Sequence, residues 1–503
     1  ALPGASLTAQ AEERIVIGTT DFPRSLDPAD ADDYPSWELL THLYTGLTRQ
    51  IPGTLEFELA LAADHAVSED GLVHTFTVRD NAAFADGTPI TAQTFVDSIN
   101  RVIDQARQPA ELILDYVAAV TVGEGNTVQI TLRSPLPDVV ALVALPMFFP
   151  VHPDVYPAGD LLDLETLDEL IGNGPYRLET FRPSLDVTLS VNPAYDGPAP
   201  ANDGVIIRAY TLPIDLRLAV LGGEVDVAWR ALATPDVATL NAADDVMVEQ
   251  QPNLQVFYML FNQTPGSFGN QQFFDDEVVR HAFALLVNRE RAADRGFENT
   301  VLPLYNLLPP DLGFTVLEFP GYDREQADAV LEAGGYMARR SPVNASLYIS
   351  TDAYGDLMGS AVNEIRRGLD DSLIVSVNFT QDDAASTFIR AVERGEYLAA
   401  IIGWRPLFPS PAAYLMPLAH SSARIPRNSA YSNSDLDLIL ERAALSTDFD
   451  AQDTAYQEAQ AHLLAAYTLL PLWQGQDTIA YQAGVSGVLV ESNSWLHYDL
   501  LSK

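Results

Sequence analysis

The sequence predicts an α/β fold with more than one domain, and three observations lead to this prediction. The chain has 503 residues, more than one hydrophobic core usually organises, so we expect about two to four lobes. Hydrophobic residues make up 47% of it, an ordinary content for a globular protein. Between residues 345 and 404 predicted strands alternate with predicted helices, which is typical of a parallel sheet with helical crossovers.

This alternating segment is the most regular part of the chain. Its predicted elements, in order, are strand 345–350, helix 355–369, strand 373–380, helix 383–394 and strand 398–404. Ligands of open α/β sheets bind outside the carboxyl ends of the strands, and Trp404 and Arg405 lie where the last strand ends. By the same rule Trp229, at the end of a predicted strand, is a second site candidate.

The N-terminal part of the chain predicts a mixture of strands and helices. A strand is expected at 14–20, followed by a loop rich in Pro and Asp that cannot be helical. A helix is expected to begin at Ser36, where leucines recur at helical spacing. Alternating residues over 73–79 indicate a half-buried strand, and Thr91 is expected to cap the next helix.

Beyond Gly172 the predicted strands become longer. A helix is expected at 215–221, ending before Gly222 and Gly223. The strands expected in this part are 176–181, 187–191, 205–210, 225–229 and 254–262. The change of character at Gly172 therefore marks a candidate domain boundary.

The charge balance excludes several kinds of partner. There are 28 Lys and Arg residues against 69 Asp and Glu residues, and the formal net charge is −41. Nucleic acids are polyanions that bind proteins through Lys and Arg, so we expect no nucleic-acid partner. Anionic membrane surfaces are disfavoured for the same reason. No apolar run approaches the ~20 residues of a membrane-spanning helix.

The N-terminal residues 1–11 indicate export. They are small and mostly apolar and end in Ala9-Gln10-Ala11, which is typical of a signal-peptide remnant with its cleavage site. A flexible tether is the alternative interpretation. Either one predicts a periplasmic or extracellular, cell-surface attached protein, exported by a cleaved signal peptide.

Motifs for catalysis are absent from the sequence. There is no zinc-protease motif, phosphate-binding loop, dinucleotide fingerprint or nucleophile elbow. The chain has no Cys, and its eight His residues show no metal-binding spacing. We therefore expect no catalytic residue, no metal and no cofactor. A secreted hydrolase with paired carboxylates stays open as an alternative, because the carboxylates are too numerous to choose among.

A series of short motifs carries a family resemblance. In order along the chain they include Leu26-Asp27-Pro28, Tyr44-Thr45-Gly46-Leu47, Phe84-Ala85-Asp86-Gly87-Thr88-Pro89, Gly172-Asn173-Gly174-Pro175-Tyr176, Asn192-Pro193-Ala194-Tyr195 and Gly223-Glu224-Val225-Asp226. Together they resemble the extracellular solute-binding proteins of ABC importers in the dipeptide, oligopeptide and nickel group, family 5. The resemblance covers nearly the whole chain.

The resemblance implies a large, three-lobed α/β fold of the periplasmic-binding-protein type II, with mixed sheets and a hinge. It divides the chain into a tether or signal remnant (1–11), lobe I (12–45, 172–255 and 476–503), lobe II (46–171) and lobe III (256–475). A peptide-like or other small organic solute is expected to be captured between two lobes that close about the hinge. The protein is then expected to deliver it to an ABC permease of the inner or cytoplasmic membrane, and to act as a monomer.

One loop departs from the peptide-binding members of the family. After a strand ending in Gly-Trp they typically read Gly-Trp-x-x-Asp-Tyr-x-Asp-Pro, and the first Asp pairs with the α-ammonium of the peptide. Here Leu407 occupies that position and Ser410 the second. Burying an ammonium without a carboxylate partner is costly, so Leu407 argues against peptide capture in that mode. Asp32 or Asp33, in the loop that faces the ligand in the family, is a candidate substitute.

The other candidates for ligand contact are mainly aromatic. Trp404 is expected to form a stacking wall, with a core position as the alternative. Arg405 is expected to pair with a ligand carboxylate, with an ion pair to the surplus acid as its alternative. Further candidates at the border of the expected cleft are Tyr34, Trp229, Tyr258 and Trp473. These aromatic residues leave a saccharide receptor of the same fold open, and the scattered His residues leave a metal-chelate receptor open.

Overall fold

The computed structural model describes residues 14–164, 169–230, 232, 234–264, 274–336, 343–370, 375–381, 384–446 and 448–503. The chain divides into two compact units, of which unit 1 comprises Ala1–Ser134, Val139–Gln250 and Thr478–Lys503, and unit 2 comprises Pro135–Asp138 and Gln251–Asp477. The expected lobe III falls within unit 2, whereas lobes I and II fall almost entirely in unit 1. Their separation stays a prediction, and the expected tether at 1–11 lies outside the described residues.

The main sheet of unit 1 is organised around β1 (Ile15–Thr19). This strand pairs in parallel with β10 (Gly204–Ala209) on one side and with β11 (Val227–Trp229) on the other. β9 (Asp186–Val191) and β8 (Tyr176–Arg182) continue the sheet beyond β10 in antiparallel order. The strands predicted here are confirmed to within one residue at each end, except that β11 begins two residues later than expected.

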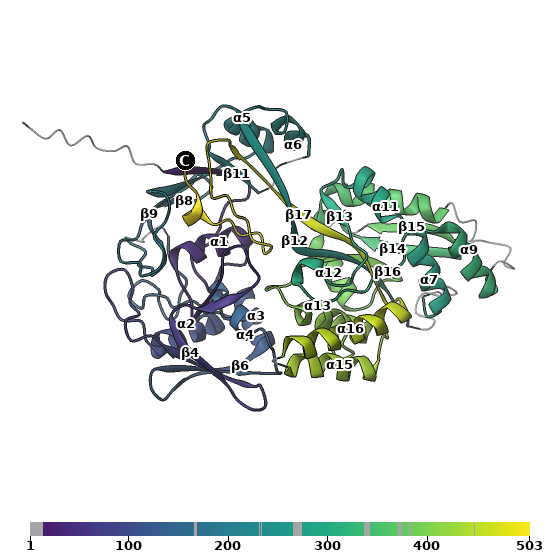
Figure 1. The fold of residues 1–503 in the computed structure, drawn as a ribbon, viewed down its shortest axis with the longest axis horizontal. Coiled ribbons are helices and arrows are strands. Elements are labelled where there is room, and N and C mark those ends of the chain that lie inside the picture. The colour runs from purple at the N-terminus through teal and green to yellow at the C-terminus, as the bar shows by residue number, and fades with distance from the viewer. Residues whose placement is uncertain are drawn as a thin grey trace, which may run out of the picture. The chain divides into compact units, whose positions relative to one another are not determined.

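Two helices cover the β1 and β11 part of this sheet (Figure 1). They are α5 (Pro213–Leu221) and α6 (Thr234–Leu240), and α5 extends the helix expected at 215–221 by two residues. The cluster of buried apolar side chains beneath them consists of Leu216, Ala219, Val220, Val225, Ala228, Leu240, Val246 and Ala480. This core packs the two helices against the sheet near the ends of β1 and β11.

Helix α1 (Tyr34–Leu43) begins two residues before the predicted start at Ser36. Asp33 is its N-cap, because the Asp33 carboxylate accepts a hydrogen bond from the Ser36 amide at 2.9 Å. The Ser36 hydroxyl instead accepts from the amides of Arg24 and Ser25, at 2.9 and 3.0 Å. The Pro- and Asp-rich loop is thereby tied to the first turn of the helix.

The rest of unit 1 contains a four-stranded antiparallel sheet with helices against it. The sheet order is β4 (Ala62–Val67), β5 (Val73–Val78), β7 (Thr127–Leu132) and β6 (Val117–Gly123). The other elements are β2 (Thr48–Gln50), β3 (Phe57–Leu59), α2 (Ala92–Gln105), α3 (Gln108–Tyr116), α4 (Val139–Leu142) and two 3-10 turns, η1 (Pro146–Phe148) and η5 (Tyr498–Leu500). The predicted cap is confirmed, since Thr91 and Thr94 form a reciprocal capping box on α2.

The sheet of unit 2 is mixed. β14 (Val343–Ile349) pairs in parallel with β15 (Val375–Gln381) and with β16 (Ala399–Trp404), as the alternating pattern predicted. β16 pairs antiparallel with β12 (Val246–Phe261), which starts in unit 1. β12 begins eight residues before the expected strand 254–262. The polar residues that precede Leu254, among them Glu249 and Gln250, interrupt the alternation that predicts a strand.

The remaining elements of unit 2 are two further strands of this sheet, β13 and β17, and the helices and turns around it (Figure 1). They are α7 (Glu277–Leu286), α8 (Arg289–Arg291), the π-turn η2 (Ala292–Gly296), β13 (Val301–Pro303), η3 (Pro310–Leu312), α9 (Arg324–Ala333), α10 (Thr351–Tyr354), α11 (Asp356–Asp370), α12 (Ala385–Glu393), α13 (Pro411–Ala419), α14 (Arg424–Asn428), α15 (Ser434–Leu445), α16 (Phe449–Ala466) and β17 (Leu469–Gln482). Strand β17 continues into unit 1, where it pairs with β11.

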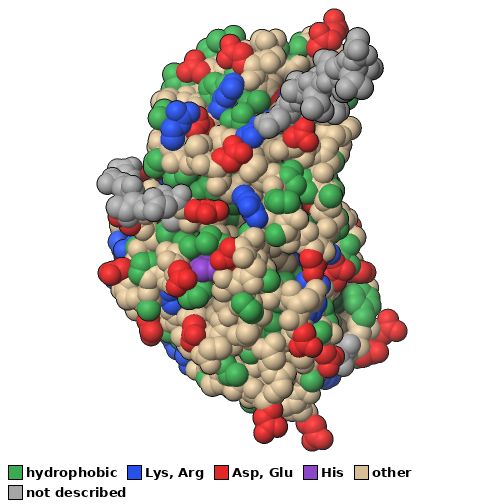
Figure 2. Space-filling model, turned by 90° about the vertical axis from the view of Figure 1, so that its left-hand side faces the viewer, with side chains coloured by type: hydrophobic (Ala, Val, Ile, Leu, Met, Phe, Trp, Pro, Cys, Tyr) green, Lys and Arg blue, Asp and Glu red, His purple; other side chains and the backbone are tan. Residues whose placement is uncertain are grey.

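The surplus acid of the chain is distributed over the one face of the surface that Figure 2 draws. On the face drawn in Figure 2, Asp and Glu side chains are spread among Lys and Arg and are not gathered in one patch. Such a distribution keeps a protein solvated without creating a single strong field. Within the described part of the chain, none of the helices has both the length and the apolar character needed to cross a membrane.

Candidate functional site

The carboxyl ends of the parallel strands of unit 1 form the first part of the candidate site. β1 ends at Thr19 and β11 ends at Trp229, so Asp21 and Arg230 follow at the same edge of the sheet. Arg230 has a positive φ of 71°, which turns the chain sharply after β11. This edge is where ligands of α/β sheets bind.

Glu38 of α1 is the buried anchor of this edge. One of its carboxylate oxygens accepts hydrogen bonds from Trp229 Nε1 at 2.9 Å, Arg230 Nη2 at 2.9 Å and the Leu496 amide at 2.8 Å. The other accepts from the Tyr498 hydroxyl at 2.5 Å. A carboxylate that is only 2% exposed needs such partners, because an unpaired buried charge is strongly destabilising. Trp229, itself 2% exposed, is thus held in the interior of unit 1.

The last two carboxylates of the acidic loop before α1 pair with the same arginine. Arg24 lies 3.2 Å from Asp32 and 3.3 Å from Asp33, and both contacts are at the surface. The Asp33 carboxylate also accepts from the amide of Ser36 at 2.9 Å and from its hydroxyl at 2.8 Å. Tyr34 follows as the first residue of α1 and is half-buried. Asp33 therefore caps helix α1. Asp32 is the more solvent-accessible of the two carboxylates.

Asp21, like Glu38, is a carboxylate of this edge that was not predicted as a site residue. It lines a small cavity of about 10 Å³ together with Glu38, Trp229 and Arg230. Desolvation, with Asp33 and Glu38 adding to it, raises the pKa of Asp21, while Arg230 and Arg24 oppose the shift. Burial disfavours the ionised form of this carboxylate. A further positive charge beside Asp21 would stabilise that ionised form.

The loop after β16 forms the candidate surface of unit 2. Trp404 is half-buried, and its indole N–H donates to the Ala413 carbonyl at 2.9 Å, which fixes the ring against α13. Arg405 and Leu407 are also half-buried. The part of each side chain that reaches the surface is available for contact with a solute.

Ser410, the second position of the departing motif, is fully buried. Its hydroxyl hydrogen-bonds to Asp138, which belongs to the short segment Pro135–Asp138 of the same unit. Burial raises the pKa of Asp138 to about 6, although the hydrogen bond from Ser410 lowers it. Ser410 is engaged in this pair and presents no free hydroxyl to a solute.

Tyr258 and Trp473 lie in the interior of unit 2, both 0% exposed. The Tyr258 hydroxyl donates to the Leu307 carbonyl at 2.5 Å, and burial raises the pKa of Tyr258 well above its usual value. The Trp473 indole N–H donates to the Arg289 carbonyl at 3.1 Å, and its ring packs edge-on against Phe297 with a centroid distance of 5.0 Å. These contacts are those of core residues.

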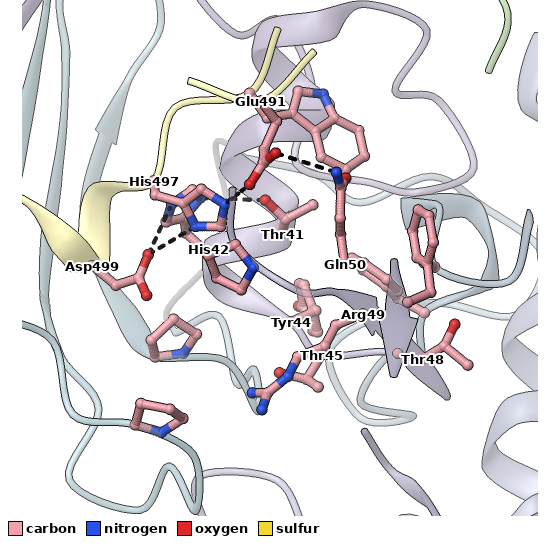
Figure 3. Close-up of a pocket in the computed structure, with 18 of the residues that line it drawn as sticks. Thr41, His42, Tyr44, Thr45, Thr48, Arg49, Gln50, Glu491, His497 and Asp499 are labelled. Atoms are coloured by element: carbon pink, nitrogen blue, oxygen red, sulfur yellow. Dashed lines mark hydrogen bonds and ion pairs between the residues drawn. The ribbon is translucent and has the colours of Figure 1, made fainter. Parts of the chain in front are cut away.

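Unit 1 also contains a larger cavity, of about 170 Å³ (Figure 3). We call it the α1 cavity, because α1 and the turn into β2 form one wall and the C-terminal segment forms another. The polar residues on its walls include Thr41, His42, Thr45, Arg49, Gln50, Tyr195, Glu491, His497 and Asp499, and the apolar ones include Phe57, Ala144, Phe149 and Trp495. It shares no lining residue with the small cavity beside Asp21.

His497 lies between two carboxylates on one wall of the α1 cavity. Its Nε2 is 2.8 Å from Glu491 Oε1 and its Nδ1 is 3.4 Å from Asp499 Oδ1, as the dashed lines in Figure 3 show. Burial disfavours the charged ring, but the hydrogen bonds to Asp499 and Glu491 outweigh it and raise the pKa of His497 to about 9. The ring is therefore a cation at neutral pH, and it lowers the pKa of Asp499 against the effect of burial.

His42 of α1 lies next to this pair and is neutral. The Tyr498 amide donates to His42 Nε2 at 2.9 Å, so the ring proton is on Nδ1, which donates to the Glu38 carbonyl at 2.8 Å. Burial lowers the pKa of His42, and the 4.0 Å approach of its Nε2 to Asp499 does not reverse this. The ring stacks on Tyr498 at a centroid distance of 3.9 Å.

Comparison with solved structures defines the class of protein. The unliganded open form of MppA, a periplasmic murein tripeptide binding protein, matches with a TM-score of 0.83 and 24% identity over 98% of this chain and 97% of its own. HbpA2 of Haemophilus parasuis matches with a TM-score of 0.85 and 19% identity, over 97% and 99%. The fold is that of a type II periplasmic binding protein, which confirms the predicted fold class.

Curated relatives span the whole chain as well. The probable D,D-dipeptide-binding periplasmic protein DdpA of Escherichia coli is 25% identical, over 95% of this chain and 91% of its own length. The periplasmic murein peptide-binding protein MppA of the same species is 26% identical, over 94% and 89%.

The family model of the bacterial extracellular solute-binding proteins, family 5, matches residues 56–425, and the chain belongs to this family. The predicted resemblance is confirmed. The chain is accordingly a solute-binding protein, and its predicted role in substrate binding for an ABC importer is confirmed with it.

Proposed function

We propose that the ligand of this protein is a short peptide or a peptide-like solute with a free α-ammonium group. Two relatives that span most of the chain are named for peptide ligands, D,D-dipeptide for DdpA and murein peptide for MppA. Two structures of the same fold are complexes with the peptide STSA and with Met-Leu. The chain itself must then offer a carboxylate to the ammonium, although Leu407 stands where the peptide-binding members typically have Asp.

The main support for this proposal is the edge of the unit 1 sheet where β1 and β11 end, which we call the strand-end edge. It holds four carboxylates, on Asp21, Asp32, Asp33 and Glu38, but only two guanidinium groups, on Arg24 and Arg230. Glu38 pairs with Arg230, and Arg24 is shared between Asp32 and Asp33, so the four carboxylates exceed the two guanidinium groups by two negative charges. An ammonium placed at Asp21 would be stabilised by this surplus.

The loop after β16 is a separate proposed contact surface, in unit 2. The exposed part of the Trp404 ring provides a flat apolar surface for a side chain, and the Arg405 guanidinium suits a bidentate pair with a ligand carboxylate. Leu407 adds an apolar contact. Tyr34 remains a proposed contact beside the acidic loop, whereas Trp229, Tyr258 and Trp473 support the site from the interior.

We propose further that the protein is exported by a signal peptide that is cleaved, acts as a monomer and hands its ligand unchanged to an ABC permease. No catalytic step, metal, cofactor or nucleic acid enters this proposal. Several positive charges in the described part of the chain pair with carboxylates, for example Arg49 with Glu58 at 2.6 Å.

A saccharide ligand is the second candidate, because Trp404 is partly exposed and Leu407 replaces the usual Asp. Calorimetric titration with a set of di- and tripeptides and a set of oligosaccharides separates the two. The proposal expects saturable binding of peptides, with a dissociation constant of about 1 mM or lower, and none of the sugars. Binding of oligosaccharides alone would replace the peptide proposal with the saccharide one.

A further inference from the structure

The α1 cavity is a second binding site candidate, separate from the strand-end edge of unit 1. Its volume of about 170 Å³ is similar to that of a known engineered protein cavity of ~150 Å³ that binds benzene. A solute with a single ring or a short branched chain would therefore fill it. All of its walls belong to unit 1.

The charge on one wall of the cavity is negative. Glu491 and Asp499 share the single imidazolium of His497, at 2.8 and 3.4 Å. The neighbouring His42 adds no positive charge, because the amide of Tyr498 donates to its Nε2 and leaves the ring neutral. On another wall the guanidinium of Arg49 is paired at 2.6 Å with Glu58, which lies outside the lining. The wall formed by the C-terminal segment thus carries one more carboxylate than cation.

Aromatic side chains form part of the apolar lining. Phe57 comes from β3, Phe149 follows η1, and Trp495 comes from the C-terminal segment. Aromatic faces attract cations, and the attraction is stronger where the contact is desolvated. A negative wall and aromatic faces together favour a positively charged guest over a neutral or negative one of the same size.

We propose that the α1 cavity binds a small organic cation, namely an amine or quaternary ammonium ion that carries one ring or a short aliphatic chain. The positive group faces Asp499 and Glu491, and the apolar part lies against Phe57 and Phe149. The proposal does not depend on the peptide proposed as the main ligand. It is tested with probes that lack a peptide bond.

The first experiment is calorimetric titration of the full chain with benzylamine, benzyl alcohol and benzoate, which differ mainly in charge. Benzylamine is expected to bind about tenfold more tightly than benzyl alcohol, and benzoate is expected not to bind. Equal binding of the amine and the alcohol, or preferential binding of benzoate, would overturn the proposal.

Two variants locate the binding. Ala144→Phe fills the cavity and is expected to abolish benzylamine binding, and Phe57→Leu removes one aromatic face and is expected to weaken it by about threefold or more. The matched control is Phe181→Leu, a half-buried aromatic residue of β8 that does not line the cavity, and it should leave binding unchanged. If Ala144→Phe does not fold, Phe57→Leu still tests the proposal. An unchanged affinity of Phe57→Leu for benzylamine would contradict it.

The charge of His497 provides an independent readout. Phenyltrimethylammonium keeps its charge at every pH, whereas the His497 ring loses its proton around pH 9. The groups that face His497 are Glu491, Asp499 and the neutral His42, and Arg49 with Glu58 lies across the cavity. We expect the affinity for phenyltrimethylammonium to rise about tenfold from pH 8 to pH 10, because the wall gains one net negative charge. An affinity that is constant or falls over this range would contradict the proposal.

Discussion

Trp229 at the end of β11 donates its indole N–H to Glu38 of α1 over 2.9 Å, and the two residues are 191 positions apart in the sequence. The same carboxylate oxygen accepts from Arg230 and from the Leu496 amide. A single buried carboxylate therefore joins the central sheet of unit 1, its first helix and its C-terminal segment. The candidate strand-end edge takes its shape from this junction.

Replacing Glu38 should destabilise unit 1 strongly. Glu38→Gln removes the buried negative charge that pairs with Arg230 and accepts from Trp229, and we expect the free energy of unfolding to fall by about 3 kcal/mol. Glu58→Gln is the matched control, because Glu58 forms an exposed ion pair with Arg49 and its loss should cost less than about 1 kcal/mol. Chemical denaturation of both variants measures the difference, and equal effects would contradict the assigned role of Glu38.

The pair of carboxylates around His497 predicts a loss of stability at alkaline pH. The pKa of His497 is about 9 in the fold against an ordinary value of 6.5, so folding favours the protonated ring. The stabilisation is fully present below the ordinary pKa and is lost as the pH rises through the folded one. We expect a decrease on the order of 3 kcal/mol in the free energy of unfolding between about pH 6 and about pH 10. His497→Gln should lack this slope; an identical slope in both proteins would refute the assignment.

His42 predicts the opposite sign. Because burial lowers its pKa, the unfolded chain takes up a proton on His42 at a higher pH than the folded chain does. The fold loses stability as the pH falls below the ordinary His value. Long-range proton–nitrogen NMR spectra of the folded protein at pH 6 should show a neutral His42 ring with its proton on Nδ1. A protonated ring, or a proton on Nε2, would be inconsistent with the bonds to Glu38 and Tyr498.

Two tryptophans of unit 2 should respond differently to substitution. Trp473 is fully buried and bonded to the Arg289 carbonyl, so Trp473→Phe is expected to lower the free energy of unfolding by about 2 kcal/mol. Trp404 is half-buried at the end of β16, so Trp404→Ala should change stability less and weaken binding of the proposed peptide ligand by about tenfold. Denaturation and calorimetry on both variants test this. Peptide affinity unchanged in Trp404→Ala would remove Trp404 from the proposed site.

Local sequence patterns predicted much of the fold. The alternating segment that contains β14, β15 and β16 and the capping box at Thr91 are built from neighbouring residues, so their patterns are visible in the sequence. The strand-end rule located the β16 loop, and the family resemblance located its departure at Leu407. The first half of β12 was missed because its exposed polar residues carry no alternation.

The contacts of the candidate site were less predictable, because they join residues that lie far apart in the sequence. Glu38 is held by Trp229, Arg230 and Tyr498, which lie far from it in the sequence, and nothing around Glu38 indicates a buried charge. Asp21 was passed over because it is one of many acidic residues, and only the end of β1 beside β11 distinguishes it. Trp473 and Tyr258 were selected from family position alone, and the sequence does not reveal the direction of a side chain on a strand.

The central claim is that unit 1 recognises the α-ammonium of a peptide through Asp21. The most direct test is calorimetric titration with the best-binding tripeptide from the peptide set and with its N-acetylated form, on the natural chain and on Asp21→Asn, with the exposed Asp215→Asn of α5 as control. We expect acetylation of the peptide and Asp21→Asn each to weaken binding by about tenfold or more. Combining the two changes should weaken binding by less than the sum of their separate effects on the binding free energy. Asp215→Asn should have no effect. Equal affinity for the free and acetylated peptides on the natural chain would contradict it.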